Sequence, residues 1–373
     1  MSPEPDTTDL CRGEAMRAEK TAGNATAGVL RVLMAGKLTA LDSPGGGEVQ
    51  MLSTARALAG LGVAARLWRP WEEQLAEADC LHLFGSSPEH LPVVAAARRQ
   101  GLPVVLSTIA WFDPASYWAE PRPLWRRAAG CGWLLARWQL PQLPSWRRRL
   151  YRAVDLTLPN SNAEAEQLIR SFGVPPERIQ VVPNGAEERF AEADPEPFAR
   201  LVGMRGFVLV AGRIEPRKNQ LGLLAALGGS GIAVVVLGDA VPGCEAYAEA
   251  CRREAGRNVR FVGRLDHDDP LLASAYAACG CLALVSWYET PGLAALEAGM
   301  SGTPLVLPER GAAREYFGDD ALYVRPNDRA GIRAAVLAAL AKGRSDALAE
   351  RVRRHFSWAA AARVTRDAYR RVL

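Results

Sequence analysis

The sequence predicts an α/β fold made of two domains, each built on a doubly wound parallel sheet. With 373 residues, the chain is longer than one domain of ordinary size. Short apolar runs of strand type alternate with helical stretches along most of its length, which is typical of parallel sheets covered by helices on both faces. A segment rich in Pro and acidic residues, 194–197, separates two such series. We therefore place the domain boundary near Asp194.

The first domain is expected at 28–193, after a polar tail at 1–27 that we expect to be disordered. Its first strand-type run, 29–35, is followed by three glycines and a helical stretch at 48–60. A glycine loop between a strand and a helix lets the backbone approach a phosphate, so Gly46 and Gly47 are candidate phosphate ligands. An ordinary turn is the alternative, because glycines mark turns as well.

The rest of this domain offers three candidate acceptor contacts. Further strand-type runs follow at 63–68, 80–84 and 104–107, with a helical stretch at 92–100. His82 lies in the second of these runs, and a lone His is more often a satisfied structural residue than a functional one. We keep it as a candidate together with Trp111 and Asp113, which follow the third run.

The segment 111–151 is rich in both Trp and Arg and has no acidic residue after Glu120. This composition is typical of an element at a membrane interface, where Trp lies at headgroup depth and Arg meets anionic lipid. A partly buried helical excursion with a solvated Arg face is an alternative, and Arg with Trp also suits single-stranded nucleic acid. From this composition we expect an anionic membrane surface or a lipid-linked acceptor as the partner. We expect no nucleic acid, because the net charge of the chain is only +4.

The second domain, 194–356, begins with a strand-type run at 207–210 and a cationic loop. Arg213 and Lys218 flank this loop, which leads through Asn219 into a helix, so their charges can converge on one diphosphate. An ordinary charged surface loop is the alternative. Further strand-type runs at 233–237 and 259–262 follow, and the second ends at the turn of Arg264 and Leu265.

A buried run at 281–285 leads into the sequence SWYETPGLAALEAGMSGTPLV at 286–306. We expect Thr290 to cap the following helix and Pro291 to be its first residue, where a missing N–H costs nothing. Glu289 should then lie in the loop at the carboxyl end of the strand. Glu297 should lie about two turns into the helix.

These motifs resemble the retaining glycosyltransferases of family 4, which have the GT-B fold. The resemblance is carried by two Glu seven residues apart around a Pro-Gly-Leu helix start, by the Arg…Lys-Asn loop at 213–219 and by VVPNG followed by ERF at 181–190. It covers 211–324 most closely and extends more loosely to 29–47 and 154–185. The tail and the segment 111–151 are outside it.

The resemblance implies transfer of a hexose from a nucleoside diphosphate sugar, with retention at the anomeric carbon and with no metal or cofactor. Arg213 and Lys218 would neutralise the leaving diphosphate, Glu289 would hold sugar hydroxyls and Glu297 the ribose. The remaining implied donor contacts are the loop glycines Gly46 and Gly47, the turn of Arg264 and Leu265 at the base, and Asn219, Thr290, Pro291, Gly292 and Leu293. The expected acceptor is a lipid-linked glycan or a polysaccharide precursor, and the last helix, 357–373, would cross back to the first domain.

One departure from the family concerns the sugar. Family members often carry a His after a strand of the first domain, facing the transferred sugar, but the matching stretch 107–113 contains none. Two alternatives stay open: a nucleotide-sugar epimerase or phosphorylase on the same fold, and a noncatalytic GT-B partner protein.

Composition excludes several other classes. No run of about 18 uncharged apolar residues could form a membrane-spanning helix, and the polar N-terminus lacks the apolar core of a secretory signal. Seven scattered Cys do not make a disulfide framework, which indicates reduced thiols and a cytoplasmic location. The composition of 111–151 adds the expectation of a peripheral position at the inner face of the membrane.

Overall fold

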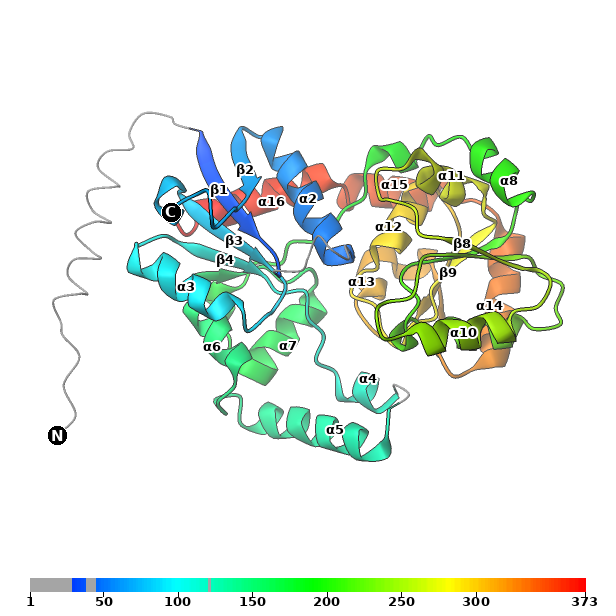
Figure 1. Cartoon of the computed structure of the whole chain (residues 1–373), viewed down its shortest axis with the longest axis horizontal. Coiled ribbons are helices and arrows are strands. Elements are labelled where there is room, and N and C mark those ends of the chain that lie inside the picture. The colour runs from blue at the N-terminus through cyan, green and yellow to red at the C-terminus, as the bar shows by residue number, and fades with distance from the viewer. Residues whose placement is uncertain (1–28, 38–44, 120–121) are drawn as a thin grey trace.

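The computed structural model describes residues 29–37, 45–119 and 122–373 of the chain. They form two parallel sheets, one in each half of the sequence, with helices packed around each sheet (Figure 1). This confirms the predicted fold class. The tail expected at 1–27 lies outside the described residues.

The first sheet has five parallel strands in the order β2-β1-β3-β4-β5. The strands are β1 (Leu30–Ala35), β2 (Val63–Leu67), β3 (Cys80–Phe84), β4 (Val104–Ser107) and β5 (Leu156–Thr157). β3 and β4 are buried along their whole length, as expected for strands covered on both faces. The helices of this half are α2 (Gly46–Ala59), α3 (His90–Arg99), α4 (Pro114–Ala119), α5 (Leu124–Gln139), α6 (Trp146–Ala153) and α7 (Asn162–Phe172).

The second sheet has six parallel strands in the order β11-β10-β9-β6-β7-β8. The strands are β6 (Val208–Ala211), β7 (Val234–Leu237), β8 (Val259–Gly263), β9 (Cys281–Ala283), β10 (Leu305–Pro308) and β11 (Leu322–Val324). The helices are α8 (Glu196–Val202), α9 (Gln220–Leu227), α10 (Glu245–Glu254), α11 (Pro270–Ala278), α12 (Leu293–Met300), α13 (Ala313–Phe317), α14 (Arg329–Lys342) and α15 (Asp346–His355). The strand order reverses between β6 and β9, and ligands of open α/β sheets bind at the carboxyl ends of strands at such a reversal.

The chain returns to the first sheet at its end. Helix α16 (Trp358–Arg370) packs against α2, and Figure 1 shows it running from the second half of the molecule back to the first. Trp358, Ala362 and Tyr369 are buried in one hydrophobic cluster with Val32 and Met34 of β1. The two halves are therefore joined by a packed helix as well as by the chain that connects them.

The start of α12 differs from the prediction. The helix begins at Leu293, after Gly292 in a left-handed conformation with φ 72°. The Gly292 N–H donates to the Thr290 carbonyl, which closes a tight turn where we expected the first helical residues. The assignment of Thr290 as the cap and Pro291 as the first residue was wrong, because the glycine adds a turn before the helix. Glu297 consequently lies about one turn into α12 rather than two.

Candidate active site

A cavity of about 990 Å³ lies between the two halves, at the carboxyl ends of both sheets. Loops after β6 and β9 approach it from one side, and the start of α2 approaches it from the other. The structure brings most of the candidate donor ligands to its walls: Gly46, Gly47, Arg213, Lys218, Arg264, Leu265, Glu289, Thr290, Gly292, Leu293 and Glu297. Asn219 and Pro291 are not among the residues that line it.

Lys218 and Glu289 form an ion pair at this wall, with 2.6 Å between Nζ and Oε1. The Ser286 hydroxyl donates to the same carboxylate oxygen at 2.6 Å. Burial alone would raise the pKa of Glu289, but the charges of Lys218 and Arg217 outweigh it and hold that pKa below its usual value. Burial is also the main reason that the pKa of Lys218 is lowered, against the opposing charge of Glu289. The pair therefore keeps two nearly buried charges in a fixed geometry before any ligand binds.

Asn219 has a structural role that explains the shape of the cationic loop. It adopts a left-handed conformation with φ 54°, which Asn tolerates better than most residues. Its buried amide donates to the carbonyls of Val285 and Pro326 at 3.1 and 2.8 Å. These bonds fasten the end of the loop to the segments that follow β9 and β11, and so help to hold Lys218 beside Glu289.

Arg217 is a residue of this wall that the sequence analysis missed. It lines the cavity, and its guanidinium pairs with Glu215 at 2.9 Å. Arg213 is more exposed, with 45% of its side chain accessible, and lies 3.7 Å from Glu215. Three cationic side chains therefore surround one end of the cavity, and only the sequence spacing of Arg213 and Lys218 indicated any of them.

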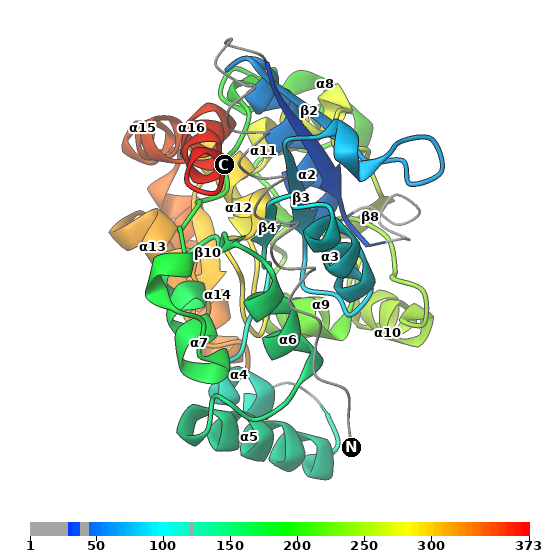
Figure 2. The same ribbon diagram turned by 90° about the vertical axis from the view of Figure 1, so that its left-hand side faces the viewer.

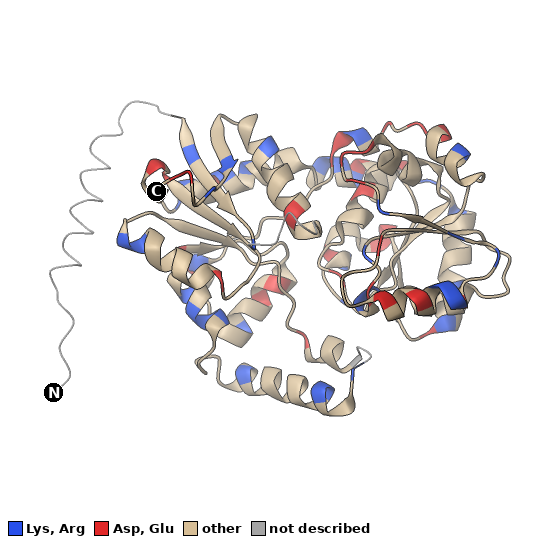
Figure 3. Ribbon diagram, viewed as in Figure 1, with Lys and Arg blue, Asp and Glu red and all other residues tan. Residues whose placement is uncertain are grey.

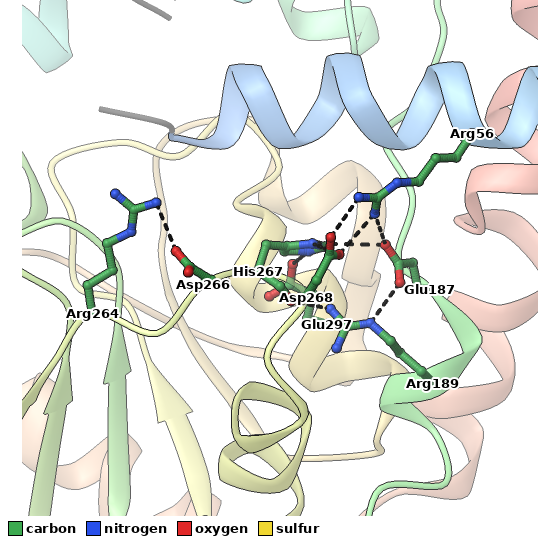
Figure 4. Close-up of polar contacts among 8 residues, drawn as sticks. All are labelled: Arg56, Glu187, Arg189, Arg264, Asp266, His267, Asp268 and Glu297. Atoms are coloured by element: carbon green, nitrogen blue, oxygen red, sulfur yellow. Dashed lines mark hydrogen bonds and ion pairs between the residues drawn. The ribbon is translucent and has the colours of Figure 1, made fainter. Parts of the chain in front are cut away.

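Glu297 lies at another part of the wall and is 5% exposed. Its Oε1 is 3.0 Å from Nε2 of His267, and its Oε2 accepts from the Tyr276 hydroxyl at 2.7 Å. Figure 4 shows His267 lying directly beside Glu297, with Arg264 farther along the same strand-to-helix connection. His267 and Tyr276 were not identified from the sequence, because nothing in their spacing relates them to Glu297.

The first half contributes the start of α2 and the loop after β4. A Cβ on Gly45 would lie 3.2 Å from Arg213, and a Cβ on Gly47 would lie 3.4 Å from Ile109. Ile109 occupies the stretch that contains no His and has a φ of 44°, a conformation that is strained for a β-branched residue. It lines the cavity, so an apolar side chain faces this space where family members often carry an imidazole.

Buried Glu164 holds the loop that contains Ile109. Its Oε1 accepts from the Thr108 hydroxyl at 2.5 Å and from the Ala110 N–H at 2.7 Å, and its Oε2 accepts from the Asn160 N–H at 2.8 Å. The bonds to Thr108 and Ala110 flank Ile109 on both sides. They explain how the structure maintains a strained residue at the cavity.

The three candidate acceptor residues have different positions. Trp111 lines the cavity, and its ring lies parallel to that of Tyr288 at 6.2 Å, across the gap between the halves. Asp113 instead accepts from the N–H and hydroxyl of Ser116 and is not a lining residue.

His82 is not brought to the cavity. It is 1% exposed and lies between Tyr369 Oη and Ser107 Oγ, at 2.7 and 2.9 Å. Burial lowers its pKa to about 3. His82 is therefore a neutral residue of the core, as a lone His more often is, and it does not contact the cavity.

Within the described residues, one group has the spacing of a metal site. The ligand atoms of Glu187, His267 and Asp268 lie within 4.8 Å of one another. Arg56 donates to both oxygens of Asp268, and Arg189 pairs with Glu187 at 2.7 Å. Guanidinium groups therefore already neutralise the two carboxylates that a metal ion would need. That sugar transfer needs no metal is still a prediction.

Two parallel-sheet domains with a cationic loop and two buried carboxylates around one cleft define a glycosyltransferase of the GT-B class. Residues 196–355 match the family described as glycosyl transferases group 1, and residues 43–185 match the glycosyl transferase 4-like domain. The chain belongs to these group 1, family 4 glycosyltransferases, and it transfers a sugar from a nucleotide sugar.

Individual relatives agree with this membership. The glycogen synthase of Mycobacterium tuberculosis is 30% identical over 321 residues, which cover 82% of this chain and 69% of that protein. The D-inositol 3-phosphate glycosyltransferase of Geodermatophilus obscurus is 28% identical, covering 85% of this chain and 84% of that protein. Among solved structures, sucrose-phosphate synthase from Thermosynechococcus elongatus has a TM-score of 0.72 at 19% identity, covering 92% of this chain and 98% of that one. HepE of Anabaena, solved with UDP and glucose, has a TM-score of 0.67 at 17% identity, covering 91% and 99%.

Proposed function

We propose that the chain is a retaining hexosyltransferase that binds the leaving diphosphate through Arg213 and Lys218, without a metal ion. Lys218 is the single observation that carries this proposal: a nearly buried ammonium, paired with Glu289, at the edge of a cavity large enough for a nucleotide sugar. A cation fixed in this way stabilises negative charge that develops on the leaving group. Arg213 and Arg217 add positive charge at the same end of the cavity.

Two carboxylates would fix the rest of the donor. Glu289 would accept hydrogen bonds from the sugar hydroxyls, and Glu297 from the ribose, while the turn of Arg264 and Leu265 would lie against the base. These carboxylates would bind the donor rather than react with it. A glycosidase needs two carboxylates that flank one bond, whereas these two would contact different parts of the donor, the sugar and the ribose. UDP, which HepE binds in its solved complex, is therefore the first donor nucleotide to test.

A donor screen tests this function. Thermal unfolding with UDP-, GDP- and ADP-sugars should show a raised melting temperature for one nucleotide series, since a ligand at 100 times its dissociation constant adds about 2.7 kcal/mol. Free nucleoside diphosphate should then accumulate only when an acceptor is added. Isomerised nucleotide sugar without any acceptor would instead indicate an epimerase. Donor binding with no turnover on any glycan or lipid-linked acceptor would indicate a noncatalytic protein.

We further propose that helix α5 docks on an anionic membrane and brings a lipid-linked or polysaccharide-precursor acceptor to the cleft. The helix lies at the outer end of the first half, away from the first sheet (Figures 1 and 2). Leu124, Trp125 and Leu135 are 70%, 67% and 50% exposed. Arg122 and Arg126 are exposed beside them, and Figure 3 shows basic but no acidic residues along this helix.

Apolar and cationic side chains that share one exposed helix suit the headgroup region of an anionic bilayer. The acceptor class remains part of the proposal, because the relatives are named for glycogen and for an inositol phosphate. No helix in the described part of the chain is both long and apolar enough to span a membrane.

Two Arg residues of the segment 111–151 have partners within the protein. Arg137 is buried and donates to the carbonyls of Ser171 and Leu143. The Arg147 guanidinium lies over the rings of Phe112 and Trp146. We therefore base the membrane proposal on the exposed side chains of α5 and not on these two Arg residues.

A further inference from the structure

Glu297 is held at both carboxylate oxygens by neighbouring side chains. His267 Nε2 lies 3.0 Å from Oε1, and the Tyr276 hydroxyl donates to Oε2 at 2.7 Å. A carboxylate oxygen accepts two hydrogen bonds, so each oxygen keeps one acceptor position for a ligand. All three residues line the cavity, and the two anchors together fix the plane of the carboxylate.

The second nitrogen of His267 faces a group of charges. Nδ1 lies 3.6 Å from Asp268 and 3.9 Å from Glu187. Two guanidinium groups border these carboxylates (Figure 4): Arg56 of α2 contacts Asp268, and Arg189 contacts Glu187.

The remaining neighbours of His267 keep the ring in place. The Phe190 ring packs against the imidazole in an edge arrangement, with 6.0 Å between the ring centroids. Arg189 donates to the His267 carbonyl. The orientation of the imidazole is thus fixed by Glu297 at Nε2, by the carboxylates near Nδ1 and by the packing of Phe190.

The direction in which the pKa of His267 shifts agrees with this geometry. Burial alone would lower the pKa of His267, but the hydrogen bond and charge of Glu297, together with the charge of Glu187, outweigh burial and Arg189 and raise that pKa. A protonated imidazole donates from both nitrogens. The geometry and the direction of this pKa shift both favour an N–H donated from Nε2 of His267 to Glu297.

We propose that His267 is a positioning residue for ribose recognition: with Tyr276 it orients the Glu297 carboxylate so that each oxygen accepts a hydrogen bond from one of two adjacent ribose hydroxyls. This inference rests on the proposed function, in which Glu297 holds the ribose. A carboxylate fixed before binding loses less freedom when the ligand arrives, so its contribution to affinity is greater. The preference of the enzyme for a ribose over a 2′-deoxyribose should therefore depend on His267, although His267 does not contact the sugar.

Calorimetric titration with paired nucleotides tests the proposal. The probes are the nucleoside diphosphate that binds best among UDP, GDP and ADP, and its 2′-deoxy counterpart. The wild type should bind the ribonucleotide about tenfold or more tightly than the deoxynucleotide, the size expected for one hydrogen bond to a charged group. In His267→Ala this ratio should fall toward one, because the ribonucleotide loses two oriented hydrogen bonds to Glu297 whereas the deoxynucleotide, which keeps only the 3′ hydroxyl, loses one.

Two further variants separate positioning from folding. His267→Gln keeps an N–H donor and should restore part of the preference, whereas His355→Ala, which removes an exposed His at the end of α15, should leave it unchanged. Melting temperatures measured alongside show whether each variant folds. Equal losses of affinity for both nucleotides in His267→Ala and His267→Gln would indicate a purely structural role and overturn the inference.

The same titrations distinguish this inference from the proposed function. If Glu297→Gln abolishes the ribose preference but His267→Ala keeps it, His267 does not position the carboxylate and only the inference fails. If the wild type shows no preference, or Glu297→Gln leaves it intact, the assignment of Glu297 to the ribose fails and the inference fails with it.

Discussion

Replacing Lys218 with Ala should slow sugar transfer on the order of a hundredfold in a protein that still folds. The Lys218 ammonium lies 2.6 Å from Glu289 with only 16% of its side chain exposed, so it can act on the leaving group in a poorly hydrated site. Removing one such contact to developing negative charge costs about 3 kcal/mol, which corresponds to roughly a hundredfold in rate. The assay is the initial rate of nucleoside diphosphate release at saturating donor and acceptor.

The same substitution leaves the Glu289 carboxylate buried with Ser286 and Arg217 as its remaining partners. Unfolding should therefore become easier by about 1–3 kcal/mol, the cost of an under-satisfied buried group. Adding Glu289→Gln should recover part of this stability without recovering the rate, because the unpaired charge is gone but the cation is still missing. Lys342→Ala, at the exposed end of α14, is the matched control. A folded Lys218→Ala enzyme with a near-normal rate would refute the reasoning.

Three other predictions concern metal, membrane and pH. Excess chelator should leave the initial rate unchanged, since cationic side chains supply the charge at the diphosphate; loss of activity with rescue by manganese or magnesium would contradict this. The wild type should co-sediment with anionic but not neutral vesicles at low salt and detach near 1 M salt, where screening shortens to about 3 Å. Trp125→Ser with Arg126→Glu should abolish that binding while Arg333→Glu on α14 does not, and a wild type that ignores anionic vesicles would end the membrane proposal. Burial, against three hydrogen bonds, raises the pKa of Glu164 from 4.5 to about 7, so the folded chain holds this proton more tightly than the unfolded chain, and the free energy of unfolding should fall as pH rises between these values. Denaturant titrations at pH 5 and 7.5 should show a smaller fall in Glu164→Gln, and equal falls would show that this carboxyl is not the source.

The fold and the cationic loop could be predicted because the information for them is local. Buried parallel strands consist of continuous apolar runs, such as VLVA in β6 and VVVL in β7, which can be recognised without knowing their neighbours. Arg213 and Lys218 belong to one strand-to-helix connection, so their spacing in the sequence already implied that they share a loop. The Glu289 and Glu297 pair was likewise recognised from one continuous motif.

The partners of these residues depend on contacts that no local pattern encodes. His267 meets Glu297 across 30 positions, and His82 is satisfied by Tyr369 across 287 positions. The first contact makes His267 a residue of the site, although nothing in the sequence singled it out. The second keeps His82 in the core, which agrees with the structural role that is commoner for a lone His. The positive φ of Ile109 could not be predicted from the sequence either, because Glu164 of helix α7 holds the loop in which Ile109 lies.

The most direct test of the central claim is a calorimetric titration of the preferred nucleoside diphosphate in excess chelator, comparing the wild type with the double variant Arg213→Ala and Lys218→Ala. The account predicts binding by the wild type without any metal ion. It predicts a loss of about a hundredfold or more in the double variant, since two charged hydrogen-bond donors at roughly 1.5–3 kcal/mol each are removed. Unchanged affinity in a folded double variant, or binding by the wild type only after a divalent ion is restored, would contradict the claim that these two side chains hold the diphosphate.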